Sequence, residues 1–376
     1  MKDKQSNLTM SQQQPTEAKL QELAKHFSLK GEIDTIAPLG GGFINSTFII
    51  KTKGDSPDYI LQKKNKNIFK NVPAMMDNIV KVTEYLRARV EKEGGDPERE
   101  VMRVVSTPEG NPYVEDSDGE FWAVCEFIPD TLSYESASNP DLARKGGEGI
   151  GKFLMQLADF NTPLYPTIEG FHDLAYRFGQ WDNTKEKNLS GRADEVKDEI
   201  EWVEKRKPMM KAFWSLVEKG VLPKRVTHND TKLSNILFDK KGNVQCVIDL
   251  DTVMSNTALA DYGDAIRSFA NSGEEDDRNL ENVSLNKDMF RAYTEGYLSR
   301  TKDILSEAEK ENLFMAPLYI TYEQVMRFLM DYIDGDTYYK TSYPGHNLVR
   351  TRAQMKLMES MEENIDFMKQ IIKDNI

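Results

Sequence analysis

Cysteine, long apolar runs and positive charge are all scarce in this sequence, and each shortage excludes a class of protein. Only Cys125 and Cys246 occur among 376 residues, and their spacing predicts neither a zinc site nor a disulfide framework. No run approaches the roughly 18 apolar residues that span a bilayer, and the first twenty residues lack the apolar core of a signal peptide. A reducing cytoplasm is the simplest compartment that these shortages predict.

The charge balance restricts the partners. Lysine and arginine number 49 against 62 acidic residues, so the net charge is 49 − 62 = −13. Nucleic acids and anionic membranes bind basic surfaces, so we expect neither as a partner. A small anionic ligand can still bind through local groups. The hydrophobic content of 39% is ample for a folded core.

The hydrophobic pattern divides the chain into two parts behind a disordered tail, which we expect over residues 1–14. Residues 15–128 predict a small sheet with few helices. Helices are expected at 16–27 and 73–90, and strands at 33–39, 44–52, 59–64, 100–107 and 120–128. Residues 129–376 are mainly helical by periodicity, with one strand hairpin. We therefore predict an α+β fold of two lobes, a small N-terminal antiparallel sheet lobe and a mainly helical C-terminal lobe, with a cleft between them.

The hairpin lies within "VTHNDTKLSNILFDKKGNVQCVIDLDTVM", residues 226–254. His228, Asp230, Lys232 and Asn235 precede its first strand, and Asp249 follows its second. Carboxylate and amide oxygens suit Mg²⁺, and an uncoordinated aspartate can accept a proton from a hydroxyl. The structural alternative is a hairpin with polar turn residues, in which Asp230 caps a turn and His228 is a satisfied core residue.

The order of these residues resembles a known catalytic loop. His-x-Asp-x-Lys-x-x-Asn, followed by Ile-Asp with Asp249 placed 249 − 230 = 19 positions after Asp230, resembles the loop and the metal-binding aspartate of protein-kinase-like phosphotransferases. Asp251 either joins Asp249 at the metal or has a structural role. Asp264 and Arg267 are expected to form a structural ion pair beneath the loop.

The N-terminal part would then supply a loop that covers ATP. In "PLGGGFINSTFII", Gly40 and Gly42 match the first two glycines of Gly-x-Gly-x-x-Gly, and Asn45 takes the third position. The alternative is a plain glycine-rich turn. At the connector "CEFIPD", the backbone groups of Glu126 and Ile128 are expected to meet the adenine, an inference from position.

The strand 59–64 should present a lysine to the nucleotide phosphates. Alternation places Gln62 and Lys63 on opposite faces, so only one can point toward the phosphates. Charge favours Lys63, and the alignment of the strand could instead select Gln62. The acidic partner on the following helix is either Asp77 or Glu84, and each of these could simply be solvated.

The combination of "THNDTKLSN" with "VIDLDTV" resembles the aminoglycoside phosphotransferase and choline kinase superfamily, because the "DFG" and "APE" of protein kinases are absent. Further motifs, among them "YILQKKNKNIFKN", "FWAVCEFIPDTLSYE" and "RFLMDYIDGDTYYK", are similar to those of N-acetylhexosamine 1-kinases. Those enzymes transfer the γ-phosphate of ATP to the anomeric hydroxyl of N-acetylglucosamine or N-acetylgalactosamine. The resemblance implies a protein-kinase-like fold, with ATP and Mg²⁺ as cofactors and a sugar as substrate.

Individual roles follow from the same resemblance. It implies Asp230 as the base, Asn235 and Asp249 as magnesium ligands, and sugar contacts from Arg327 and Tyr338. Lys232 and Lys63 would offset the charge that develops during transfer. Phe43 stands where such kinases often carry histidine, which puts the sugar preference in doubt.

Two rival functions remain open, and the sequence indicates no protein partner. The first is a choline or aminoglycoside kinase, whose cationic acceptor would meet an acidic rim of Asp331, Asp334, Asp336 and residues 274–277; Arg327 argues against it. The second is a nucleotide-binding regulatory protein without catalysis, which the intact Asp230 disfavours.

Overall fold

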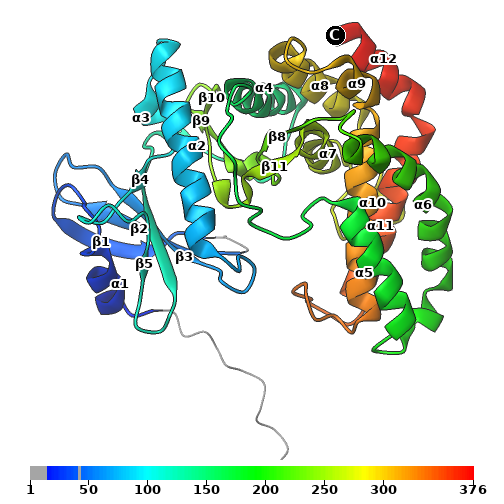
Figure 1. The fold of residues 1–376 in the computed structure, drawn as a ribbon, viewed down its shortest axis with the longest axis horizontal. Coiled ribbons are helices and arrows are strands. Elements are labelled where there is room, and N and C mark those ends of the chain that lie inside the picture. The colour runs from blue at the N-terminus through cyan, green and yellow to red at the C-terminus, as the bar shows by residue number, and fades with distance from the viewer. Residues whose placement is uncertain (1–14, 41–43) are drawn as a thin grey trace, which may run out of the picture. The chain divides into compact units, whose positions relative to one another are not determined.

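The computed structural model describes residues 15–40 and 44–376, which form two compact units (Figure 1). The first unit contains the described residues up to Val72 together with Arg103–Phe127. The second contains Pro73–Met102 and Ile128–Ile376. In the described residues, no helix combines the length and the apolar character that a membrane span requires.

The first unit is an antiparallel sheet with one packed helix. The strand order is β1-β2-β3-β6-β4, and the short β5 pairs with β6. The elements are α1 (Glu17–Ala24), β1 (Ile33–Pro38), β2 (Ser46–Thr52), β3 (Tyr59–Lys64), β4 (Val104–Val105), β5 (Val114–Glu115) and β6 (Phe121–Glu126). The small N-terminal antiparallel sheet lobe is thereby confirmed. The strand expected over 100–107 is reduced to the two residues of β4.

Alternation along the strands gives the sheet one apolar face. Thr16 caps α1 by accepting from the Lys19 amide at 3.3 Å, and the helix then places Leu20 and Leu23 in a core cluster with apolar residues of β2, β3 and β6. On β3 this buried face carries Tyr59 and Leu61. Because side chains alternate along a strand, Lys63 lies on the same face as Tyr59 and Leu61, the face that α1 covers. Gln62 and Lys64 lie on the opposite face of the sheet.

The second unit is mainly helical, as expected. Its helices are α2 (Val72–Lys92, whose first residue belongs to the first unit), α3 (Pro97–Glu100), α4 (Pro140–Gln156), α5 (Leu174–Lys187), α6 (Lys197–Glu218), α7 (Ala258–Phe269), α8 (Lys287–Thr301), α9 (Glu307–Asn312), α10 (Met315–Ile333), α11 (His346–Glu363) and α12 (Ile365–Asn375). Its strands are β7 (Thr131–Leu132), β8 (Lys224–Thr227), β9 (Ile236–Asp239), β10 (Val244–Val247) and β11 (Met254–Thr257).

Helix α10 forms the centre of this unit. Nearly all of its residues are buried, because α5, α6, α7 and α11 pack around it, and Figure 1 shows α10 beside α11 and α5. A helix that is apolar on all sides is expected in such a position. The predicted hairpin of β9 and β10 is present. The pairing of β8 with β11 and of β7 with β9 was not predicted, because strands of two to four residues carry almost no periodic signal.

Helices α4 and α8 approach closely through glycine, which gives a prediction. A Cβ on Gly147 would lie 2.2 Å from the carbonyl oxygen of Tyr293 in α8. We expect Gly147→Ala to lower the free energy of unfolding by about 3 kcal/mol, since backbone must move. Gly179→Ala in α5 is the matched control, because its Cβ meets nothing within 4 Å and alanine favours a helix by about 1 kcal/mol. Urea denaturation checks both variants, and an unchanged midpoint for Gly147→Ala would refute the close packing.

Candidate active site

The predicted catalytic loop leaves β8 at His228 and enters β9 after Asn235. The strand β8 pairs with β11, and β9 pairs with β10, so both ends of the loop are fixed by sheets. The Ile248 amide donates to the carbonyl oxygen of Asn235 at 2.9 Å, which joins the end of the loop to the segment that carries Asp249. The sequence therefore brings the two halves of the motif together through the hairpin alone.

Two aspartates of α7 hold the backbone of the loop. Asp261 accepts from the amides of His228 at 2.9 Å and Asn229 at 2.6 Å, and Asp264 accepts from the Thr231 amide at 2.9 Å. Spaced three apart, they lie on one helix face. Sequence reasoning missed the role of Asp261, although the pair of acids in "DYGD" was a usable signal.

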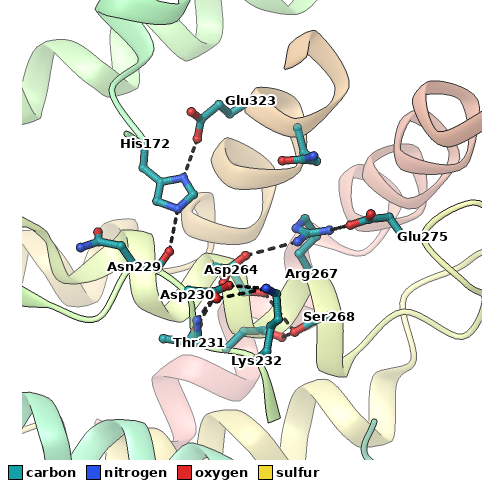
Figure 2. A network of polar contacts seen from close by, with 12 residues as sticks. His172, Asn229, Asp230, Thr231, Lys232, Asp264, Arg267, Ser268, Glu275 and Glu323 are labelled. Atoms are coloured by element: carbon teal, nitrogen blue, oxygen red, sulfur yellow. Dashed lines mark hydrogen bonds and ion pairs between the residues drawn. The ribbon is translucent and has the colours of Figure 1, made fainter. Parts of the chain in front are cut away.

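Arg267 completes this support from the same helix. Its guanidinium pairs with Asp264 at 3.3 Å and with Glu275 at 2.7 Å, so the predicted ion pair beneath the loop is confirmed (Figure 2). Burial acts to raise the pKa of Asp264, but Arg267 and neighbouring cations hold it below its ordinary value. Asp261 lacks such a partner. Burial therefore raises its pKa to about 6, against the lowering effect of His228 and the two amides.

The Asp230 side chain lies beside both of its predicted companions. Lys232 Nζ is 2.8 Å from Asp230 Oδ1, and Asn235 Nδ2 donates to the Asp230 carbonyl oxygen at 2.8 Å and to Oδ2 at 3.2 Å. Burial acts to lower the pKa of Lys232, but the Asp230 carboxylate more than offsets this and the net shift is upward. The loop thus holds a carboxylate with an adjacent, firmly protonated amine.

His228 connects Asp230 to the following hairpin. Its Nδ1 accepts from the Asp230 amide at 3.2 Å, and its Nε2 lies 2.8 Å from the Ile248 carbonyl oxygen. A carbonyl can only accept, so the proton resides on Nε2. The histidine therefore has a positional role. Its contacts are those of a satisfied core histidine, which was the structural alternative predicted from the sequence.

Asp249 and Asp251 follow β10 at a sharp turn. Asp249 has a left-handed backbone conformation with φ of 60°, a conformation that aspartate tolerates better than most residues. It is partly exposed, whereas Asp251 is buried in the 3₁₀ turn Leu250–Thr252. Asp239 closes the hairpin turn by accepting from the amides of Lys241 and Asn243.

The donor set of Asn235 and Asp249 fits a hard cation. Both amide hydrogens of Asn235 point to Asp230, which leaves the amide oxygen as the end that can face a metal. Together with the Asp249 carboxylate it offers the oxygen ligands that Mg²⁺ prefers. Among residues 15–40 and 44–376, no cluster of three or more His, Cys, Asp or Glu side chains is arranged to hold a metal.

A second histidine, His172, reaches the loop from a distant segment. Its Nε2 lies 3.1 Å from the carbonyl oxygen of Asn229, and its Nδ1 lies 2.7 Å from Glu323 of α10. Arg177 of α5 donates to the other carboxylate oxygen of Glu323 at 2.8 Å. Figure 2 shows His172 and Glu323 on one side of the loop and Arg267 on the other. Sequence reasoning missed it, although an acid within the apolar helix α10 was a signal.

The predicted sugar-contact residues gather in an aromatic box around Arg327. We define the box as Arg327 with Phe171, Tyr338 and Tyr339, whose ring centroids lie 5.8, 6.0 and 5.5 Å from the guanidinium carbon. Tyr338 is 63% exposed, so the box meets solvent at this ring. Phe171 directly precedes His172, and their rings are 4.1 Å apart.

The acidic residues near the box are used within the protein. Asp331 is buried and accepts from the backbone amides of residues 337–339 and from Asn347, all within 2.9 Å. Asp334 accepts from Thr184 at 3.1 Å, and Asp336 pairs with Arg192 at 2.6 Å. Asp331 thus shapes the segment that presents Tyr338 and Tyr339.

On the first unit, the structure separates the two β3 lysines. Lys63 pairs with Glu120 at 3.3 Å, on the face that α1 covers. Lys64 is buried, and its Nζ donates to Gln62 Oε1 at 2.7 Å on the opposite face. Asn45 accepts from the Asn65 amide at 3.1 Å, directly after β3.

Several other predicted nucleotide residues are placed without a decisive contact. Gly42 and Phe43 lie outside the described residues, and a Cβ on Gly40 would meet nothing within 4 Å. The Glu126 amide donates to the Arg103 carbonyl at 2.9 Å. The Ile128 carbonyl accepts from the Thr131 hydroxyl at 2.9 Å.

The two predicted acids of α2 lie on its exposed side. Asp77 and Glu84 are exposed, and Asp77 pairs with Lys81 of the same helix. Asn78 of α2 points inward: it is fully buried and donates to the carbonyls of Tyr165 at 2.7 Å and Val253 at 3.0 Å.

Comparison with known proteins identifies the family and the fold. Residues 35–300 match the phosphotransferase enzyme family. A microcompartment-associated aminopropanol kinase superposes with a TM-score of 0.62 at 16% identity, covering 94% of this chain and 98% of the kinase. A spectinomycin phosphotransferase bound to ADP and spectinomycin gives 0.60 at 13% identity, covering 93% and 100%. An aminoglycoside phosphotransferase from Alicyclobacillus acidocaldarius gives 0.58 at 13% identity, covering 94% and 96%.

These likenesses confirm the protein-kinase-like fold that the sequence predicted, over nearly the whole length of the chain. The family match spans most of the sequence, including the glycine-rich segment, the catalytic loop and α7. The chain belongs to the phosphotransferase enzyme family.

Proposed function

We propose that the protein transfers the γ-phosphate of ATP to the anomeric hydroxyl of N-acetylglucosamine or N-acetylgalactosamine. The observation that carries this proposal is the aromatic box, because Phe171 of the box is joined directly to His172, which bonds to the peptide group of Asp230. Aromatic rings suit the apolar face of a sugar, and the guanidinium of Arg327 can donate to its neutral oxygens. The motifs shared with N-acetylhexosamine 1-kinases support the same acceptor.

Asp230 is proposed as the base of a direct transfer. It accepts the proton of the anomeric hydroxyl as the oxygen bonds to the γ-phosphorus, and the bond from that phosphorus to the bridging oxygen of ADP breaks. An anomeric hydroxyl is more acidic than an ordinary alcohol, so a carboxylate is a sufficient base. Lys232, 2.8 Å from Asp230 Oδ1, offsets negative charge during transfer.

Asn235 and Asp249 are proposed to hold Mg²⁺ through the amide oxygen and the carboxylate. Bound there, the ion would neutralise charge on the phosphate oxygens. The protein supplies the rigidity of this pair through the 2.9 Å bond from the Ile248 amide to the Asn235 carbonyl. Asp251 is buried beside it and is proposed to have a structural role.

Gly40, Asn45 and one face of β3 are proposed to contact the phosphates of ATP, with the Glu126 carbonyl and the Ile128 amide near the adenine. Of the β3 side chains, we favour Lys64 and Gln62 over Lys63, since Lys63 is engaged by Glu120 on the α1 face.

This assignment gives a prediction for paired variants. Lys64→Met should raise the KM for ATP about tenfold, the effect of losing roughly 1.4 kcal/mol of charge-assisted binding. Lys63→Met should leave the KM for ATP near its original value, because the lysine serves a surface ion pair. Steady-state kinetics at saturating acceptor measure both. If Lys63→Met raised the KM for ATP more than Lys64→Met, the phosphate contact would be assigned to Lys63 instead.

An acceptor panel tests the proposed function. ADP release is measured with Mg²⁺ and ATP in the presence of N-acetylglucosamine, N-acetylgalactosamine, choline or aminopropanol. We expect turnover with at least one amino sugar and none with the two cations, because three acids once considered for a cation rim, Asp331, Asp334 and Asp336, are engaged by Asn347, Thr184 and Arg192. Activity with a cationic acceptor alone would overturn the sugar assignment.

A further inference from the structure

The peptide group that joins Asn229 to Asp230 is bonded at both ends by histidines. Its N–H donates to His228 Nδ1 at 3.2 Å, and its carbonyl oxygen accepts from His172 Nε2 at 3.1 Å. The first histidine belongs to the loop itself. The second, His172, lies between α4 and α5, 57 residues before Asn229. This peptide plane fixes the direction in which the Asp230 side chain leaves the backbone.

His172 carries two protons in this arrangement. The carbonyl of Asn229 can only accept, so Nε2 must donate to it. The Glu323 carboxylate, 2.7 Å from Nδ1, is likewise an acceptor when it is ionised. The imidazole therefore donates from both nitrogens and is cationic. It is also buried, so its orientation is set by these two bonds and by the Tyr319 hydroxyl, which donates to the His172 carbonyl.

The charges around His172 favour the cation. Burial acts to lower the pKa of His172, but Glu323 raises it by more, with a further contribution from Asp264, and the net shift is upward. Glu323 stays ionised because His172 and Arg177 lower its pKa against the effect of burial. The charged groups that act on the imidazolium or on its carboxylate partner are Glu323 and Arg327 of α10, Asp264 of α7 and Arg177 of α5.

The backbone at this position is strained in a way that the contacts explain. His172 has φ of 54°, in the left-handed region, and Gly170 two residues earlier has φ of 63°. A non-glycine residue there costs on the order of 1 kcal/mol or more and persists only when the surroundings demand it. This conformation places the Phe171 side chain in the aromatic box and the His172 side chain against the catalytic loop.

We propose that His172 is a positioning residue for phosphoryl transfer, which holds the Asp230 peptide plane from the side of the aromatic box. The proposal rests on the proposed role of Asp230 as the base, and it does not depend on which acceptor the box receives. Because Phe171 and His172 are consecutive, a ligand that orders the aromatic box also orders the Asp230 carboxylate. That carboxylate must meet the hydroxyl of the ligand.

Two amide substitutions separate the two bonds of the imidazole. The amide nitrogen of glutamine can reach the position of Nε2, so His172→Gln keeps a donor to the Asn229 carbonyl and gives up the donor to Glu323. Asparagine places its amide near the position of Nδ1, so His172→Asn keeps the contact with Glu323 and loses the hydrogen bond to the Asn229 carbonyl. Asparagine also tolerates φ of 54° better than glutamine. We therefore expect the asparagine variant to be the more stable of the two.

Activity should follow the opposite order. His172→Asn should lower kcat about tenfold or more, as a displaced catalytic group does, with little change in the KM for ATP. His172→Gln should retain most of kcat although it melts at a lower temperature. The kcat of the wild type should fall as the pH rises through the His172 pKa, and the glutamine variant should lack that decline, since it has no group to titrate there.

Hydrogen exchange provides a readout that needs no acceptor. In the full-length protein without ligand, the amides of residues 228–231 should exchange faster in His172→Asn than in the wild type, and His172→Gln should retain protection. Equal protection in the two variants, or kcat values that rank with melting temperature, would overturn the positioning role. If no tested acceptor is phosphorylated, the proposed sugar kinase fails, while the exchange result still decides the role of His172.

Discussion

Asp230→Asn should reduce phosphoryl transfer by at least about 10³-fold, because an amide cannot accept the proton of the acceptor hydroxyl. The affinity for ATP should stay close to that of the wild type, since the carboxylate contacts Lys232 and Asn235 within its own loop. Steady-state ADP release measures kcat, and calorimetry measures ATP binding.

The same hairpin provides a control for this substitution. Asp239→Asn alters an aspartate that accepts from the turn itself, from the Lys241 and Asn243 amides at 2.8 Å and the Asn243 side chain at 2.9 Å. Its kcat should match the wild type. Turnover near normal in Asp230→Asn would show that another group removes the proton, and the assignment of the base would be abandoned.

Asp261→Asn should cost at least about 100-fold in kcat although Asp261 touches no reacting atom. The carboxylate accepts from the amides of His228 and Asn229 with separate oxygens. An asparagine offers one oxygen and one N–H₂ group, so one loop amide would face another donor in a fully buried site. Asp288→Asn, at an exposed position of α8, is the control that should keep full activity.

The stability of the wild type relative to Asp261→Asn should depend on pH. The pKa of Asp261 is raised by burial from 3.8 to about 6, so folding favours its protonated form. Its contribution to stability is therefore complete below pH 3.8 and declines as the pH rises through 6. The wild type should gain stability over the variant when the pH falls from 7 to 5. Urea denaturation at the two pH values measures the gap, and a gap that narrows on acidification would contradict the raised pKa.

The proximity of the candidate catalytic residues was predictable from the sequence because they lie close together along the chain. Asp230, Lys232 and Asn235 lie within six positions, and a hairpin brings Asp249 back to them, so short-range patterns suffice. The ion pair of Asp264 and Arg267 was predictable for the same reason, since residues three apart share a helix face.

The groups that orient the loop could not be predicted in this way. Glu323 contacts His172 across 151 residues, and Asp261 contacts His228 across 33. Such pairs arise from the packing of α10 and α7, which no local period specifies. A charged residue inside an apolar helix, as Glu323 is, indicates a buried partner, but its identity requires the fold.

The β3 lysine shows a similar limit. Alternation distinguishes the two faces of the strand, but it does not say which face is covered. Only the packing of α1 against Leu61 assigns Lys63 to the covered face and leaves Lys64 with Gln62 on the other. The local pattern was correct, and the missing information was tertiary.

The most direct test of the account follows the oxygen that receives phosphate. N-acetylglucosamine and N-acetylgalactosamine labelled with ¹⁸O at the anomeric position are each incubated with the enzyme, ATP and Mg²⁺, and the products are examined by ³¹P NMR. Direct transfer to the anomeric hydroxyl predicts, for at least one sugar, a sugar 1-phosphate whose phosphorus shows the isotope shift of a bound ¹⁸O. A sugar phosphate without that shift, or phosphorylation of neither sugar, would contradict the proposed reaction.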